Sequence, residues 1–268
     1  MTRLACQSTR AAITPVLTDW ERTGRLAIGR QNPEASLTYA YETVAVEVRG
    51  DVHWLSLNRP QALNAITTQM VVELSDYFGR LFHDRSCRIV VMRGAGRAFC
   101  AGLDIKAHGG EEPPFGGGFA FALASDIRLA GESAKMNAAF IRLGLSSCDM
   151  GVSYFLPRVV GLSVASELMM TGRFIDAHRA LATGLVSEVV ADDALPSLAQ
   201  SYIDDMLATS PIGLRMTKEG LGLAVDAPSL EAAMAIENRN QLLCAASEDF
   251  AEGLRAFREK RRPVFRGK

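Results

Sequence analysis

The sequence predicts an α/β core followed by a helical C-terminal region. Strand patterns are concentrated in the first two-thirds of the chain, where apolar residues alternate or form short runs that stop at glycine. The last third instead has helical spacing. The 268 residues are 48% hydrophobic and 22% charged, which is the composition of ordinary globular proteins and suffices for one large domain or two small ones.

The first part of the core has the order strand, strand, helix, strand. Apolar side chains alternate through residues 44–48 and again through 53–57, on either side of Gly50-Asp51, which predicts a hairpin. The stretch CRIVVMRGAG, residues 87–96, predicts a buried strand that stops at glycine. Between them, one apolar stripe at helical spacing predicts a helix within residues 64–84, formed by Met70, Leu74, Tyr77, Phe78 and Leu81.

Glycine also marks the ends of the later elements. Residues 117–126 are apolar on all sides, which predicts a helix buried in the core, and residues 126–130 predict a short strand. Farther along, the pattern predicts a helix that ends at Gly172, a short helix that ends at Gly184, and then a strand. From about Ser201 a helical pattern continues to the C-terminus.

These patterns divide the chain into three parts. Residues 1–42 form an N-terminal extension, predicted to be disordered, residues 43–198 form the core domain, and residues 199–268 form the helical region. The extension contains Arg3 and Arg10 and no acidic residue before Asp19, as in organelle-targeting peptides. The alternatives for this segment are a plain extension or a start codon placed too early.

Charge and cysteine content exclude several classes of protein. The formal net charge is −1 with basic residues spread along the chain, so we expect no nucleic-acid partner. Five cysteines form no CxxC pair, which favours a reducing compartment over a disulfide framework. No apolar run approaches the ~18 residues of a membrane span. We expect a cytoplasmic protein, or a mitochondrial matrix protein if the extension is a targeting peptide.

Common cofactor and metal motifs are incomplete. RGAGRAF follows a strand but has Phe99 where a dinucleotide-binding loop needs its third glycine. GVSYF likewise has Phe155 in place of the final glycine of a nucleophile elbow. The four histidines are far apart in sequence, so we expect no metal site: His53, His83, His108 and His178.

Two glycine loops remain, FCAGLDIKAHGG at residues 99–110 and PFGGGFAF at residues 114–121. Each leads towards an expected helix, whose first backbone N–H groups have no intrahelical partner. Two such N–H groups that converge on one carbonyl oxygen would form an oxyanion hole without any ionisable side chain. Alternatively, the glycines only permit tight turns and close helix packing.

Several motifs occur in an order typical of one family. SLNRPQALNAI, RGAGRAFCAGLDIKA, FGGGFAFALASDIRLA, LPRVVG, TGRFIDAHRALATGLVSEVV and AFREKRRPVF together resemble the enoyl-CoA hydratase/isomerase (crotonase) superfamily, from about Thr43 to Phe265. The resemblance implies a spiral of β-β-α units with a helical C-terminal trimerisation region. It also implies a homotrimer or dimer of trimers that acts on acyl-CoA thioesters, with coenzyme A entering as part of the substrate and no separate cofactor.

The resemblance assigns roles to individual residues. Leu103 and Gly117 match the two residues whose N–H groups form the family's oxyanion hole. The positions that line coenzyme A in the family correspond to Ala62, Leu63, Ala101 and Ile105, and those that reach it from a neighbouring subunit correspond to Phe257 and Lys260.

The acids of the family are missing. The two glutamates that add water across a double bond correspond here to Ala120 and Phe140, which cannot transfer a proton. Asp149 is the nearest substitute, because some isomerases and dehalogenases of the family place an aspartate in roughly this loop. It would act as a base or nucleophile, or else only as a turn residue beside Gly151. We expect Cys148, its neighbour, to be a buried, inert thiol.

The chain also lacks roughly 30 residues between AGLDIK and FGGG that the family usually has, about one helix and one strand. Either another segment fills the gap or the domain is compromised. We therefore expect a family member that binds acyl-CoA thioesters and stabilises an enolate-like intermediate, without two-glutamate hydration. The alternatives are a non-catalytic acyl-CoA-binding or assembly subunit, and a truncated chain that folds poorly.

Overall fold

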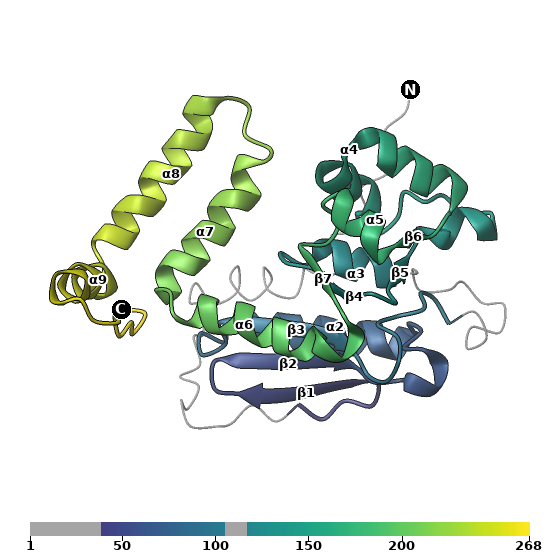
Figure 1. Cartoon of the computed structure of the whole chain (residues 1–268), viewed down its shortest axis with the longest axis horizontal. Coiled ribbons are helices and arrows are strands. Elements are labelled where there is room, and N and C mark those ends of the chain that lie inside the picture. Colours follow the sequence, from purple (N-terminus) through teal and green to yellow (C-terminus); the bar gives the residue numbers. More distant parts are fainter. Residues whose placement is uncertain (1–38, 105–116) are drawn as a thin grey trace, which may run out of the picture. The chain divides into compact units, whose positions relative to one another are not determined.

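A three-stranded sheet begins the described part of the chain (Figure 1). The computed structural model describes residues 39–104 and 117–268. Strands β1 (Val44–Arg49) and β2 (Val52–Leu57) form the antiparallel hairpin that the alternation predicts, and β3 (Ile89–Gly94) pairs parallel to β2. The predicted hairpin and the predicted strand that stops at glycine are both confirmed.

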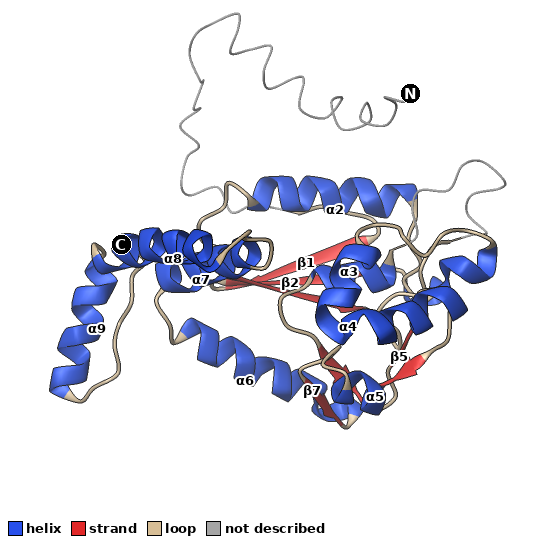
Figure 2. Ribbon diagram, turned by 90° about the horizontal axis from the view of Figure 1, so that it is seen from above, coloured by secondary structure: helices blue, strands red, loops and turns tan. Residues whose placement is uncertain are grey.

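The sheet is covered by one helix on each face (Figure 2). On one face, Leu55 and Leu57 pack with Met70 and Tyr77 of α2 (Thr68–Leu81). On the other, apolar side chains of β2 and β3 pack against α6 (Leu195–Leu207). The predicted apolar stripe of α2 is wrong at one position, because Phe78 is 47% exposed.

A second apolar cluster includes Phe119 and Ala120, at the end of the second glycine loop. It joins α3 (Gly118–Ala124), α4 (Val152–Thr171) and α5 (Ala177–Ala182). The short strands β4 (Leu129–Gly131) and β7 (Glu188–Val190) pair parallel, and β5 (Lys135–Met136) pairs with β6 (Ile175–Asp176). Left-handed glycines end α4 at Gly172 and follow α5 at Gly184, as predicted.

Three helices form the C-terminal region: α7 (Pro211–Ala224), α8 (Leu230–Ala245) and α9 (Glu248–Glu259). Each is preceded by an N-cap serine whose hydroxyl accepts a hydrogen bond from a helix amide. The prediction of helix to the C-terminus is wrong after Glu259. Beyond it the chain folds back, and its amides donate to carboxylates of α9. No helix in the described ranges has the length and apolarity needed to cross a membrane.

The segment before β1 packs against the core. Tyr39 and Tyr41, at the start of the described residues, contact the cluster around α2. The buried Glu73 carboxylate also accepts hydrogen bonds from the amides of Glu42 and Thr43. The remaining extension, residues 1–38, lies outside the described residues. The boundary drawn between residues 198 and 199 falls inside α6.

The expected gap bears on the outer edge of β3. Within residues 39–104 and 117–268, β3 pairs with β2 alone, and β4 pairs with β7 instead of extending this sheet. No described segment therefore takes the place of a strand beside β3. The described parts of the two glycine loops are in contact, since Gly118 at the start of α3 lies close to Cys100.

Candidate active site

The loop that carries Leu103 is held by a short parallel bridge to Ile66. The Ile66 amide donates to the Gly102 carbonyl at 2.7 Å, and the Asp104 amide donates to the Ile66 carbonyl at 3.0 Å. In a parallel pair, the residue between these two partners directs its own N–H away from the neighbouring strand. The Leu103 N–H accordingly has no hydrogen-bond acceptor among the described residues.

The start of α3 packs directly on the same loop. A Cβ atom at Gly118 would lie 2.7 Å from the Cys100 Sγ, and one at Gly117 would lie 3.8 Å from Cδ1 of Ile66. Ile66 is therefore a common neighbour of Leu103 and Gly117. The Gly117 residue is buried, and its N–H also lacks an acceptor among the described residues. A buried amide without an acceptor is rare, and no described residue supplies one for Gly117 or for the half-buried Leu103, which makes these two N–H groups a candidate binding site for an oxygen atom.

Two residues that the motif analysis did not single out hold this loop in place. Asn64 adopts a positive φ of 57° and is fully buried. Its Nδ2 donates to the carbonyls of Ala95 and Ala98 at 2.9 and 2.7 Å, and its Oδ1 accepts from the Arg59 amide. The Arg59 guanidinium forms an ion pair with Asp104 at 2.8 Å. Arg59 and Asn64 lie in the motif NRPQALN, and Asp104 lies in AGLD, but the sequence pattern alone does not indicate that these residues are partners.

The positions of the two family glutamates are apolar and share one cluster. Ala120 is 3% exposed, and Phe140 packs against the same buried side chains from the short 3-10 helix η2 (Ala139–Leu143). Because neither can exchange a proton, this part of the site cannot supply general acid–base chemistry.

Asp149 lies in the turn before α4. Its Oδ1 accepts from the Met150 amide at 2.9 Å, and its carbonyl accepts from Val152. The next side chain, Met150, reaches the second glycine loop, since a Cβ atom at Gly117 would lie 2.4 Å from its Sδ. Asp149 therefore has the contacts of a turn residue and is adjacent in sequence to a residue that touches Gly117.

Two cysteines lie near these loops. Burial raises the pKa of the Cys100 thiol, more than a hydrogen bond from the Gly102 amide lowers it. The expectation of a buried Cys148 is wrong, since this residue is exposed. The inward position in its loop is taken by Ser147, whose hydroxyl donates to the Met169 carbonyl at 2.8 Å.

Three of the positions assigned to coenzyme A lie side by side. Ala62 ends the 3-10 turn η1 (Pro60–Ala62), and the next residue, Leu63, is left-handed. The Leu63 carbonyl accepts from the Ala101 amide at 2.9 Å, so this segment adjoins the loop that carries Leu103. Ile105 lies outside the described residues.

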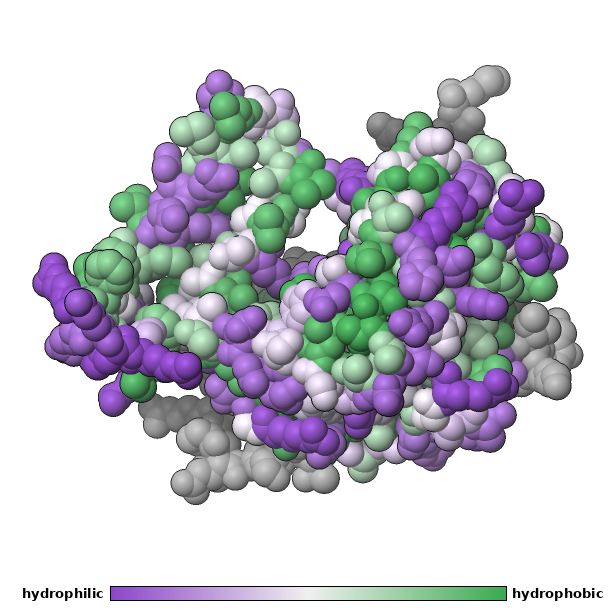
Figure 3. Space-filling view, in the orientation of Figure 1, coloured by the Kyte–Doolittle hydropathy of each residue, from purple (hydrophilic) through white to green (hydrophobic). Residues whose placement is uncertain are grey.

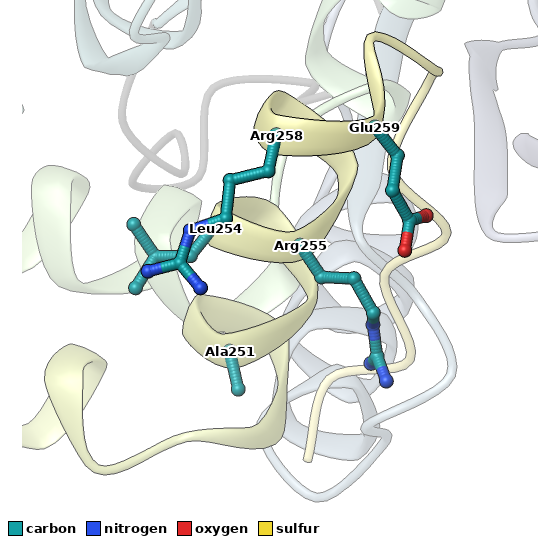
Figure 4. A pocket seen from close by; sticks show the side chains of 5 residues that line it. All are labelled: Ala251, Leu254, Arg255, Arg258 and Glu259. Carbon is teal, nitrogen blue, oxygen red and sulfur yellow. The ribbon is translucent and has the colours of Figure 1, made fainter.

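The remaining two assigned residues are on α9. Phe257 is 85% exposed, and Lys260 follows the helix with a positive φ of 54°. A shallow depression on the same helix is lined by Ala251, Leu254, Arg255, Arg258 and Glu259 (Figure 4). In the figure, Leu254 and Arg258 extend from one side of α9, whereas Arg255 and Glu259 extend from the other. No backbone hydrogen bond joins these residues to Leu103 or Gly117 within the described part of this single chain.

Comparison with known proteins identifies the fold and the family. The enoyl-CoA hydratase/isomerase family model matches residues 113–268, and a second model of the same description matches residues 52–111. The chain belongs to the enoyl-CoA hydratase/isomerase family. The α/β fold predicted from the motifs, that of the crotonase superfamily, is confirmed.

Relatives and solved structures agree with this membership. A Mycobacterium tuberculosis protein named "Probable enoyl-CoA hydratase EchA12" is 34% identical over 256 residues, covering 81% of this chain and 90% of that protein. The (E)-benzylidenesuccinyl-CoA hydratase of Thauera aromatica is 31% identical, covering 84% of this chain and 99% of that protein. The crystal structure of enoyl-CoA hydratase from Bacillus anthracis has a TM-score of 0.79 at 28% identity, covering 85% of this chain and all of that one.

The family matches also bear on the block that we expect to be missing. The two matched regions meet between residues 111 and 113, within the segment AHGGEEPP. The absence of a helix and strand here stays a prediction, and the junction of the two matches is consistent with it.

Proposed function

We propose that this chain binds an acyl-CoA thioester and stabilises an enolate-like intermediate, with the Leu103 and Gly117 N–H groups as oxyanion donors. When a proton leaves the carbon next to the thioester, negative charge develops on the thioester oxygen. Two fixed N–H dipoles stabilise that charge without any change in protonation, and loss of one such donor costs about 10²–10³ in rate.

One observation carries the proposal. Two backbone amides without acceptors among the described residues belong to neighbours of Ile66, one held by the bridge at Leu103 and the other at the start of α3. A structural role for the glycines explains the close packing of Gly118 on Cys100. It does not explain why two amides in a packed region have no acceptor among residues 39–104 and 117–268.

Asp149 is the base that we propose for removing the proton. It is joined in sequence to Met150, whose thioether touches Gly117, and it is a carboxylate in a loop where some isomerases of the family have one. Two-glutamate hydration is not part of the proposal, because Ala120 and Phe140 replace both acids.

A non-catalytic acyl-CoA-binding or assembly subunit is the second candidate. Its support is that the Asp149 carboxylate already accepts from the Met150 amide, which is the role of a turn residue. Such a protein would keep the oxyanion site for binding and have no group that moves a proton.

Deuterium exchange separates the two candidates. Butyryl-CoA in heavy water acquires deuterium at its α-carbon only if a base forms the enolate. We expect the wild type to exchange, and Asp149→Asn to lose about 10²–10⁴ of the rate while binding butyryl-CoA as before in calorimetric titration. Binding without exchange in the wild type would favour the non-catalytic subunit. No preference for butyryl-CoA over free coenzyme A would contradict both candidates.

We also propose that the protein assembles as a homotrimer or dimer of trimers through its C-terminal helices. Large apolar side chains on α7 and α8 are exposed in the single chain, among them Leu221 (65%), Leu230 (71%) and Leu242 (72%). Apolar residues are visible on the surface over these helices in Figure 3. In such an assembly, Phe257 and Lys260 would reach the coenzyme A of a neighbouring subunit, which agrees with their exposure in the single chain.

A further inference from the structure

The direction of the Leu103 N–H depends on the register of one short bridge. The pairing of Ile66 with Leu103 and the hydrogen bond from the Ala101 amide to the Leu63 carbonyl hold the two segments in this register. A slip of one residue in such a pairing reverses the sides to which successive groups point. Because the bridge is a single isolated pair, side-chain contacts next to it add to the fixing of the register.

Arg59 contacts both segments of that bridge through a single atom. Its Nη1 donates to the Ala65 carbonyl at 2.6 Å, one residue before Ile66, and it lies 2.8 Å from the Asp104 Oδ2, one residue after Leu103. The two side chains are largely removed from water, with 18% and 12% of their surfaces exposed. Charge-assisted hydrogen bonds in such surroundings are short and directional.

The backbone that presents Arg59 is itself fixed. Its amide donates to the Asn64 Oδ1 at 2.8 Å, and the Asn64 Nδ2 ties this turn to the loop after β3 through the Ala95 and Ala98 carbonyls. The backbone of Arg59 is therefore fixed, and its guanidinium links the turn after β2 to the loop of Leu103.

From this geometry we propose that Arg59 and Asp104 are positioning residues, whose ion pair sets the direction of the Leu103 N–H. The inference rests on the proposed function of that N–H as an oxyanion donor. Neither side chain is assigned a contact with the substrate. Their effect would reach the thioester oxygen through the backbone of residues 103 and 104.

The two contacts of Arg59 depend on the planar shape of its guanidinium as well as on its charge. Arginine presents several N–H donors in a fixed plane, so it can contact a carbonyl and a carboxylate together, whereas lysine offers a flexible point charge. Asp104→Asn removes the negative partner with little change of shape and leaves the guanidinium without a counter-charge, a change that weakens partly buried pairs strongly. Arg59→Lys keeps the charge and removes the plane.

The test compares two ligands that differ only at the oxygen that the site would bind. Butyryl-CoA has the thioester carbonyl, and the thioether S-butyl-CoA lacks it. The ratio of their dissociation constants therefore reports the oxyanion site, while the affinity for the thioether reports coenzyme A binding. Arg179→Lys, in the exposed ion pair with Glu167, is the matched control.

We expect the wild type and Arg179→Lys to bind the thioester at least tenfold more tightly than the thioether. In Asp104→Asn and Arg59→Lys the preference should fall at least fivefold, with the thioether affinity changed less than twofold. The rate of α-proton exchange should fall about 10–10²-fold at nearly unchanged KM, as for weakening of one donor. Should Asp104→Asn fail to fold, Arg59→Lys decides.

The outcomes are distinct. Lower thermal stability with an unchanged ligand preference would show that the pair is structural and overturn the positioning role. A wild type without any preference for the thioester would instead remove the proposed function, and this inference with it.

Discussion

At the scale of single residues, Gly117 and Gly118 show how little space the start of α3 leaves. An added Cβ at Gly118 would lie 2.8 Å from the Cβ and 3.1 Å from the carbonyl oxygen of Cys100, atoms that cannot move independently of the backbone. At Gly117 the nearest atoms are Sδ and Cε of Met150, at 2.4 and 2.6 Å, the end of a flexible side chain. The two glycines are neighbours in one motif, yet substitution should affect them differently.

Gly118→Ala should therefore destabilise the fold by about 1–3 kcal/mol, as overpacking does, which corresponds to roughly 2–12 °C in Tm for a chain of this size. Gly117→Ala should cost less, and Met150→Ala in the same chain should recover most of that loss. Thermal unfolding of the three variants checks this. Equal or greater damage from Gly117→Ala would show that the Met150 side chain cannot move aside.

At the scale of elements, Glu73 of α2 joins that helix to the start of β1. Burial acts to raise the pKa of this carboxyl, and hydrogen bonds from Thr43, Gln69 and the amide of Glu42 outweigh it, so that its pKa is lowered below the ordinary value. Because the folded-state pKa is the lower one, the contribution to stability is present above the unfolded pKa of about 4.5 and is lost as the pH falls through the folded pKa.

Glu73→Gln should consequently lower the free energy of unfolding at pH 7 by about 1.5–3 kcal/mol, the usual worth of hydrogen bonds to a charged group. The difference from wild type should shrink towards pH 3. Urea unfolding at both pH values measures it, with Glu47→Gln on the exposed part of β1 as the control. A deficit that persists unchanged at pH 3 would mean that the charge of Glu73 does not contribute.

Elements formed by local pattern could be predicted, and those that depend on distant partners could not. Alternation about Gly50-Asp51 predicts the hairpin, and Gly172 predicts the end of α4, because turn and cap chemistry are local. The pairing of Leu129 with Glu188 joins strands some 60 residues apart and leaves no local signature. The packing of Tyr39 and the hydrogen bond from the Glu42 amide depend in the same way on α2, about 30 residues farther along the chain.

The candidate site likewise has features that local sequence predicts and features that depend on distant partners. The glycine loops that carry Leu103 and Gly117 are visible as motifs, since close backbone packing demands glycine at Gly118. The ion pair of Arg59 with Asp104 joins two motifs, so neither motif alone predicts it. The turn that presents Arg59 includes Asn64 with a positive φ, a conformation that asparagine adopts in many contexts and that the sequence does not indicate.

At the scale of the whole molecule, the C-terminal helices expose several large apolar side chains. Leu230 and Leu242 lie on α8 with 71% and 72% of their surfaces exposed, and Phe257 on α9 with 85%. Exposed apolar surface favours association, because burying it between subunits removes it from water. Closed symmetric assemblies are the usual result for identical chains.

Sedimentation of the wild type should therefore give a mass of three or six times 29.0 kDa. Leu230→Glu combined with Leu242→Glu should shift the protein towards the monomer, since two buried charges without partners would oppose association. Val48→Glu, a 50% exposed position on β1, should leave the assembly intact. A stable trimer that survives both α8 changes would place the interface elsewhere. A monomeric wild type would in addition remove the route by which Phe257 and Lys260 reach a neighbour's coenzyme A, and would confine thioester binding to the loops of Leu63, Ala101 and Leu103.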